Sequence, residues 1–192
     1  GGGSCAIVSE RLYVLGALPD PESDKRRPPR RDSLLCLNAT TGERIWDVPL
    51  GDYTRERTYD SPHVPQTVVD GGVYAASRKA RLVCCDAETG EVLWQVETAP
   101  MMGDADHDHY GYSCSPLVHD GKVILWSRYG DRGFPEEQLT EILTEAQRER
   151  LKSIDPDKRM RWFWLIHASM LAFDTKTGEL AWRSRLLPGS TR

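Results

Sequence analysis

The amino-acid sequence predicts an all-β protein, a β-propeller segment of about three four-stranded antiparallel blades with a helical insertion in the third. Three observations predict this fold. One phrase occurs three times along the 192 residues, each copy reads as short strands joined by tight turns, and a long segment with helical signals interrupts the last copy. Repeats at this period are typical of propellers.

The repeated phrase reads LLCLNATTGERIW at 34–46, LVCCDAETGEVLW at 82–94 and MLAFDTKTGELAW at 170–182. A second phrase precedes each copy: AIVSERLYVL, TVVDGGVYAA and LVHDGKVILW. Gly42, Gly90 and Gly178 space the copies about 48 and then about 88 residues apart, so one period is near the length of a blade. The last copy therefore carries an insertion of about 40 residues.

Each copy predicts four strands, here lettered A to D along the chain. A hairpin turn such as Gly71-Gly72 joins A to B, and an Asp-x-x-Thr-Gly turn joins C to D, where Asp86 or Asp174 can accept backbone N–H bonds and the glycine takes a positive φ. Trp46, Trp94 and Trp182 are expected to lie flat between neighbouring sheets. The predicted blades are approximately 5–50, 64–98 and 114–186, all within one partial propeller spanning 1–192.

These phrases, apolar-x-Asp-x-x-Thr-Gly-x-x-x-Trp after Val-x-Asp-Gly-x-Val-Tyr, resemble the repeat of pyrroloquinoline-quinone-type (PQQ-like) propellers from about Ala6 to Leu186. That superfamily includes quinoprotein alcohol dehydrogenases and a non-enzymatic outer-membrane assembly lipoprotein. Such propellers usually have eight blades, so the resemblance implies that the chain is a segment whose partners include the remaining blades of a parent chain. It also implies a periplasmic or extracellular location, although the sequence begins with no leader peptide.

The long connections are all expected on one side of the propeller. The A–B and C–D turns are short and share one rim, whereas the B–C and D–A connections carry the elaborations: the Pro- and Arg-rich stretch 19–31, the insertion after Arg128, and the links 51–64 and 99–114. We call the side with the B–C and D–A connections the loop rim and the other side the turn rim. Because rigid scaffolds carry function on such loops, the loop rim is the predicted binding surface.

The insertion, approximately 131–160, predicts a helix. Pro135 suits the first helical turn, Glu136 and Glu137 favour its positive end, and Asp155-Pro156 would end it. Apolar residues fall mostly on one face: Leu139, Ile142, Leu143, Ala146, Leu151 and Ile154. The helix is read either as a cap that docks a partner or, preferentially, as an amphipathic helix packed on its own propeller.

Two groups of side chains on the loop rim are candidate ligand sites. Trp126, Trp162 and Trp164 lie outside the repeat pattern and form either an aromatic platform for a flat ligand or, preferentially, a cover over the helix–blade junction. Asp106, His107 and His109 include types that bind divalent cations. Their spacing matches no standard metal motif, so a solvated acidic loop is preferred.

Cys84 and Cys85 are adjacent, and by resemblance quinoprotein alcohol dehydrogenases carry a vicinal Cys pair beside the cofactor. In the repeat, however, this pair aligns with Cys36-Leu37 and Ala172-Phe173, and successive strand residues point to opposite faces. We therefore expect two buried thiols that behave as small hydrophobic side chains, and Cys114 has no assigned role. The basic run 25–31 is read as a solvated loop, with a patch for an acidic partner as the alternative.

Composition argues against several classes of protein. The net charge is −4, which argues against a general nucleic-acid binder, and no stretch approaches the roughly 20 apolar residues of a membrane span. Five Cys residues do not make a complete disulfide framework. No nucleophile triad or phosphate-binding loop appears either.

The first hypothesis is a non-enzymatic PQQ-like propeller that binds protein or polysaccharide through the loop rim. The alternative is a segment of a PQQ- and Ca²⁺-dependent quinoprotein alcohol or sugar dehydrogenase, in which the cofactor does the redox chemistry. A sensor module fused to another domain is a third reading. The resemblance implies Ca²⁺ ligands, a catalytic Asp and an Arg near the quinone in such an enzyme. The repeat residues are present and these cofactor residues cannot be assigned, so the scaffold hypothesis is preferred.

Overall fold

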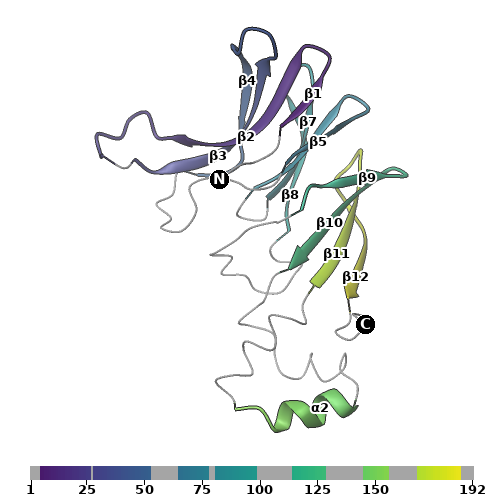
Figure 1. Ribbon diagram of the computed structural model, residues 1–192. Helices are drawn as coiled ribbons and strands as arrows, with labels where there is room; N and C mark the ends of the chain where they lie inside the picture. Colours follow the sequence, from purple (N-terminus) through teal and green to yellow (C-terminus); the bar gives the residue numbers. More distant parts are fainter. Residues whose placement is uncertain are drawn as a thin grey trace.

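The computed structural model describes residues 5–26, 28–52, 65–77, 81–98, 114–128, 145–155 and 168–186. Within them the chain forms three four-stranded antiparallel sheets, each in sequential order (Figure 1). The first sheet holds β1 (Ala6–Val8), β2 (Arg11–Pro19), β3 (Arg30–Asn38) and β4 (Arg44–Pro49). The second holds β5 (Thr67–Val69), β6 (Gly72–Ala76), β7 (Arg81–Asp86) and β8 (Val92–Glu97). The third holds β9 (Leu117–His119), β10 (Lys122–Arg128), β11 (Ala168–Asp174) and β12 (Leu180–Leu186). The predicted all-β fold with three blades is confirmed, and we call the sheets blades 1 to 3.

The three blades repeat one strand register. The second, third and fourth strands align Tyr13 with Cys36 and Trp46 in blade 1. The equivalent rows are Tyr74, Cys84 and Trp94 in blade 2, and Ile124, Ala172 and Trp182 in blade 3. The register also shifts at the same place in each blade, directly after the residue opposite the Trp. Positions can therefore be compared between blades row by row.

The A–B and C–D turns lie side by side, as hydrogen bonds between them show. The amide of Ala39 donates to the Glu10 carbonyl at 2.8 Å, that of Ala87 to Gly71 at 2.8 Å, and that of Thr175 to Gly121 at 3.0 Å. The hairpin between β5 and β6 turns through two residues of positive φ, Asp70 (50°) and Gly71 (77°), as a tight two-residue hairpin requires. These bonds place both kinds of short turn on the turn rim.

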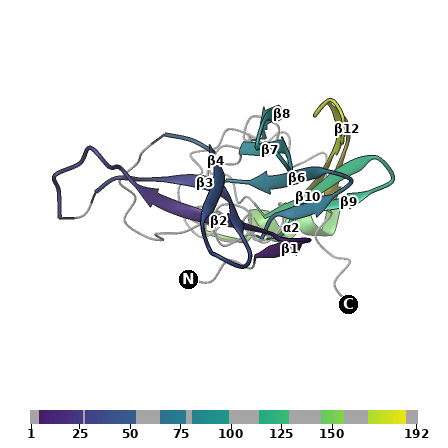
Figure 2. The same cartoon turned by 90° about the horizontal axis from the view of Figure 1, so that it is seen from above.

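Two apolar cores lie between the blades. Blade 1 and blade 2 enclose one core, which includes Leu34, Cys36, Val73 and Cys85, all fully buried. Blade 2 and blade 3 enclose the other, which includes Leu82, Leu125 and Phe173. The first strands β1, β5 and β9 contact one another in order, and Figure 2 shows the blades from above. Since each buried Leu or Phe contributes roughly 1.5–3 kcal/mol, the blades stabilise one another.

The helical insertion is a correction to the sequence analysis. In the described part of the chain the only helix is α2 (Glu145–Lys152), of eight residues. Its described side chains are all exposed, Ala146 among them, and a Lys152–Glu149 ion pair of 2.6 Å joins two of them. Because the described side chains of α2 are exposed and mostly charged, they do not form the apolar stripe of a packed amphipathic helix. The expected helix start, Pro135, with Glu136 and Glu137, lies outside the described residues.

Among the described residues, no helix has the length and apolar character required to cross a bilayer.

Candidate functional site

The Asp-x-x-Thr-Gly turn is built by one side chain that holds the backbone. Asp86 Oδ1 accepts hydrogen bonds from the Glu88 amide at 2.9 Å, the Thr89 amide at 2.8 Å and the Thr89 hydroxyl at 2.9 Å. Asp174 accepts from the amides of Lys176 and Thr177 in the same way. The hydrogen bonds from Thr89 are the main cause that lowers the pKa of Asp86. The ionised carboxylate is thus part of the turn.

The carboxylate in this turn makes the free energy of unfolding depend on pH in the acidic range. A carboxyl whose folded-state pKa is lowered contributes stability above its unfolded pKa of about 3.9, and loses it as pH falls through the folded value. Asn38 shows that an amide oxygen makes the same bonds, to the amides of Thr40 and Thr41 at 2.8 and 2.9 Å. We expect D86N/D174N to keep the fold and to lose less stability than the wild type below about pH 4. Urea unfolding at a series of pH values measures this, and unchanged acid dependence would contradict it.

The Trp of the repeat phrase in blades 1 and 2 lies on the turn of the next blade. Trp46 Nε1 donates to the Glu88 carbonyl at 3.1 Å, and Trp94 Nε1 donates to the Thr175 carbonyl at 2.9 Å. A Cβ added to Gly90 would lie 2.7 Å from Trp46 Cδ2, and one added to Gly178 would lie 2.7 Å from Trp94 Cε3. The glycines therefore let the indole rings approach the turns closely. We call the Asx-x-x-Thr-Gly turn that receives a Trp the seat.

The loop rim carries a projecting hairpin in blade 1. β2 and β3 pair continuously from Arg11↔Asn38 to Pro19↔Arg30, whereas β4 pairs with β3 only as far as Ser33. The outer half of the hairpin therefore extends beyond the sheet, as Figure 1 shows at the left of the molecule. A hydrogen bond from the Asp20 amide to the Pro29 carbonyl, 2.8 Å, continues the pairing. We call residues 16–32 the arm.

Within the arm, the described residues among 20–29 lie between the two strands and form a loop, as expected for the Pro- and Arg-rich stretch, whereas its ends at Pro19 and Arg30 belong to β2 and β3. Its base is a strand pair, and its described basic residues Lys25, Arg26 and Arg30 are exposed. Arg31, at the base, lies 3.7 Å from Asp47 on β4. Acidic Asp20, Glu22 and Asp24 lie on the same arm, so the arm presents charges of both signs. Sequence reasoning missed the strand pairing because the two prolines and the charge run mask the β-pattern of residues 16–19 and 30–32.

Buried polar side chains gather at the loop rim. Among the described residues, those that are buried are Asp32, Ser33, Gln66, Ser77 and Thr98. Each lies near the start of β3, directly before β5, or directly after β6 or β8, and these strand ends all belong to the loop rim. Gln66 Nε2 donates to the Tyr13 carbonyl in blade 1. The loop-rim end of the described blades therefore has a partly polar interior, and buried polar groups of this kind need hydrogen-bond partners.

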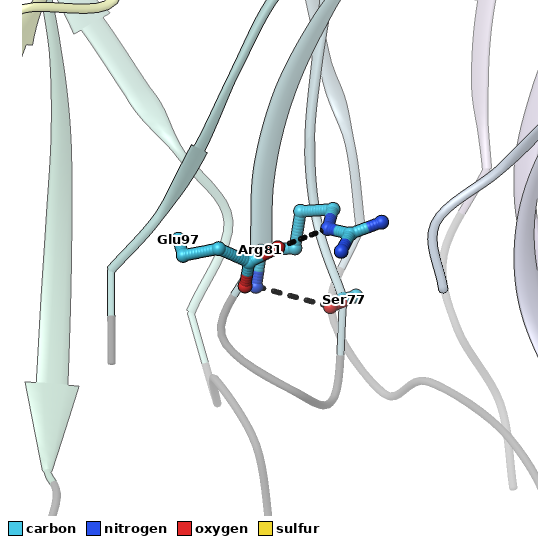
Figure 3. A network of polar contacts seen from close by, with 3 residues as sticks. All are labelled: Ser77, Arg81 and Glu97. Carbon is cyan, nitrogen blue, oxygen red and sulfur yellow. Dashed lines mark hydrogen bonds and ion pairs between the residues drawn. The ribbon is translucent and has the colours of Figure 1, made fainter. Parts of the chain in front are cut away.

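A polar network closes the short B–C connection of blade 2. The Arg81 amide donates to Ser77 Oγ at 3.1 Å, and Arg81 Nε bonds Glu97 Oε1 (Figure 3). Arg81 begins β7 and Glu97 ends β8, so the ion pair ties the two strands together at the loop rim. A partly exposed pair of this kind contributes little to stability. The ion pair does, however, hold Arg81 and Glu97 next to each other on the predicted binding surface.

Cys84 and Cys85 point to opposite sides of β7. Cys84 belongs to the core between blades 2 and 3, and Cys85 to the core between blades 1 and 2. Burial raises the pKa of Cys84 to about 11 and that of Cys85 to about 12. They are not presented together to any ligand, so they do not fit the vicinal pair of a quinone site.

The five thiols predict a labelling order. At about pH 8, exposed Cys5 should react with a thiol reagent first and half-buried Cys114 more slowly, because burial raises the pKa of Cys114. Cys36, Cys84 and Cys85 are buried and should react only after unfolding. Mass spectrometry of labelled peptides with and without urea measures this. Fast labelling of Cys84 or Cys85 in the native protein would contradict it.

Of the remaining candidate ligand residues, the structure describes only Trp126. Trp126 lies on β10 with 39% of its surface exposed, and its carbonyl accepts from Cys114 Sγ at 2.9 Å. Trp162 and Trp164, and the candidate metal ligands Asp106, His107 and His109, lie outside the described residues. Within the described ranges, no group of three or more His, Cys, Asp or Glu side chains could hold a metal ion.

Comparison with known proteins gives a family and a fold. A family profile described as "Outer membrane protein assembly factor BamB" matches residues 30–191, most of the chain. A search of curated proteins found no match to this chain.

Among solved structures, a quinohemoprotein alcohol dehydrogenase from Pseudomonas putida HK5 is 22% identical with a TM-score of 0.56, over 97% of this chain and 21% of that one. The enzyme of this class from Comamonas testosteroni is 18% identical with a TM-score of 0.55, over 95% and 20%. At these identities the likeness shows the fold alone, and the chain spans about a fifth of the length of these two enzymes.

Proposed function

Because the chain belongs to the PQQ-like repeat family described as outer membrane protein assembly factor BamB, we propose that it is a non-enzymatic scaffold that binds a protein or polysaccharide through its loop rim. In this proposal residues 1–192 are one partial propeller, completed by further blades of the same repeat. A periplasmic or extracellular location is part of the proposal and is suggested by the name of that family.

The arm is the observation that carries the proposal. It extends the β2–β3 pairing from the sheet to Pro19↔Arg30, with exposed Lys25, Arg26 and Arg30 near its tip. A two-stranded ribbon that leaves the blade buries little of its own surface, and its charged residues remain available to a partner. The buried polar residues beneath the same rim support the choice of this side.

Site-specific photo-crosslinking in cells tests the proposal. A photoreactive amino acid replaces Arg26 on the arm, and as a matched control replaces Lys176 on the turn rim, since both are exposed basic residues. We expect one dominant protein adduct, or retention on an immobilised polysaccharide array, that depends on the arm. Replacing residues 20–29 with an Asn-Gly turn should abolish it. Equal adducts from both positions would refute the loop rim as the binding surface.

A titration with PQQ and Ca²⁺ tests the enzyme hypothesis. Cys84 and Cys85 face different cores, so they do not form the adjacent pair that the resemblance implies beside a quinone. We therefore expect no stoichiometric binding by calorimetry and no dye reduction with alcohols or sugars. Tight binding together with dye reduction would replace the scaffold proposal by a quinoprotein dehydrogenase.

A further inference from the structure

One backbone edge of the arm has no neighbouring strand among the described residues. β1 pairs with β2 only from Arg11 to Tyr13, whereas β2 continues to Pro19. The repeat sets this limit, because β5 and β9, in the middle of the chain, begin in the same row of their own blades. β2 therefore extends beyond its first-strand neighbour, and it does so further than β6 or β10 does in the other blades.

Hydrogen bonds across the ribbon fix which backbone groups point to this edge. The Asp20 amide donates to the Pro29 carbonyl, and in an antiparallel pair every second residue of a strand bonds the same neighbouring strand. The even-numbered residues of β2 therefore direct their N–H and C=O groups to β3. Leu15 and Ala17 direct theirs to the opposite edge, which is the edge that β1 occupies further along β2.

Side chains cap the start of this edge in blades 1 and 3. The Tyr13 carbonyl, which points to the same edge as that of Leu15, accepts from Gln66 Nε2. In blade 3, Trp126 occupies the row of Leu15, and its carbonyl accepts from Cys114 Sγ at 2.9 Å. The fold therefore supplies side-chain partners for backbone groups that the short first strands leave unpaired.

At Leu15 and Ala17 the described part of the chain supplies no such partner, since no described group bonds the outward N–H or C=O of either residue. Residues 14–19 read VLGALP and carry no charge, although natural proteins usually protect an unpaired strand edge with charged side chains. Ala17 and Leu18 are partly exposed. An apolar edge with unpaired peptide groups favours the addition of a further strand.

We propose that the arm binds its partner by strand addition, in which an extended segment of a partner protein pairs with β2 at Leu15 and Ala17. The added strand continues the line of β1 along the same edge, so it extends a pairing that the blade already makes. N–H and C=O groups that recur at every second residue match the backbone of another β-strand. The pairing ends at Pro19, which has no N–H to donate.

This inference rests on the proposed function and narrows its partner to a protein. Main-chain hydrogen bonds supply the affinity in this mode of recognition, and side-chain contacts supply the specificity. Exposed Lys25, Arg26 and Arg30 lie on the same arm and are available for those contacts. A polysaccharide has no comparable ladder of alternating donors and acceptors, so binding of one would not require the Ala17 N–H.

Proline at position 17 removes one outward donor and leaves the pairing with β3 in place. The Ala17 N–H points away from β3, and Pro19 already occupies the next outward position of the same strand. A17P should therefore fold, as prolines on a free strand edge do, and circular dichroism checks this. A17S is the matched control, because it changes the side chain and keeps the N–H.

The probe is a phage-displayed library of random dodecapeptides, selected on the immobilised wild-type chain. We expect selected peptides that bind the wild type and A17S equally and bind A17P about 10-fold more weakly or worse. Amide hydrogen exchange by NMR gives a second measurement on the wild type alone. A bound peptide should slow exchange of the Leu15 and Ala17 amides about 10-fold or more, because both amides then donate to the added strand.

Strand addition is overturned if the selection yields no peptide, if selected peptides bind folded A17P as they bind the wild type, or if a bound peptide leaves the Leu15 and Ala17 amides unprotected. The photo-crosslinking at Arg26 separates this failure from failure of the proposed function. An arm-dependent adduct or polysaccharide retention that is unchanged in A17P leaves the loop rim as the binding surface and refutes strand addition only. Absence of any arm-dependent binding refutes both.

Discussion

Replacing Trp94 with Ala is expected to lower the free energy of unfolding by about 3–5 kcal/mol, the largest effect of any substitution considered for this chain. The indole is 8% exposed and lies in the core between blades 2 and 3. Its centroid is 6.0 Å from that of Tyr74, and its N–H donates to the Thr175 carbonyl. Truncation removes the ring contacts and leaves a cavity that the strands cannot fill. Urea unfolding followed by far-UV circular dichroism measures the loss.

Trp182 is the control for this prediction, because it occupies the same row of its blade. It is 39% exposed, against 8% for Trp94. W182A should therefore lose less than about 1 kcal/mol, as surface positions do. Equal losses for the two variants would mean that the seat does not distinguish them, and the assigned role of Trp94 would be wrong.

Gly90→Ala is expected to lower the free energy of unfolding by about 2–4 kcal/mol, through two separable causes. The φ of Gly90 is 76°, which costs an alanine about 1 kcal/mol. The new Cβ would also lie 2.7 Å from Trp46 Cδ2 and 2.9 Å from Cγ, so the ring must move out of the seat. Urea unfolding combined with Trp fluorescence reports both the stability loss and the altered ring environment.

Gly42→Ala separates the two causes. Gly42 has nearly the same φ, 74°, and an added Cβ would meet nothing within 4 Å. It should therefore show only the backbone cost of about 1 kcal/mol. The difference between the two variants measures the collision with Trp46. If both glycines tolerate alanine equally, the close approach of the indole to Gly90 is refuted.

The repeat phrase is enough to predict the three sheets, because it encodes local chemistry. Asp86 and Asp174 hold the turns with their own carboxylates, and Gly42, Gly90 and Gly178 each adopt a positive φ. These are short-range requirements that a sequence displays directly. The alignment of Cys84-Cys85 with other repeat positions likewise predicted two thiols on opposite faces of a strand.

Features that depend on contacts between distant residues could not be predicted. Gln66 reads as an ordinary polar residue before a strand, yet it is buried and bonds the Tyr13 carbonyl 53 residues away. The length of the β2–β3 pairing was not predicted, because residues 16–19 find their partners at 30–33, on the far side of the Pro- and Arg-rich loop. Of the predicted insertion helix, the described residues contain only the eight-residue α2 with exposed side chains, since the spacing of apolar residues does not show whether they find a surface to cover.

The two buried faces of β7 affect the order in which the blades separate during local unfolding. Cys84 and Cys85, one residue apart, belong to different cores, so blade 2 cannot separate from either neighbour without exposing one of its own faces. An end blade breaks one interface when it detaches, and the middle blade breaks two. In a linear array with nearest-neighbour coupling, such a difference sets the order of opening. Amide hydrogen exchange should therefore be slowest in β6 and β7 and faster in blades 1 and 3.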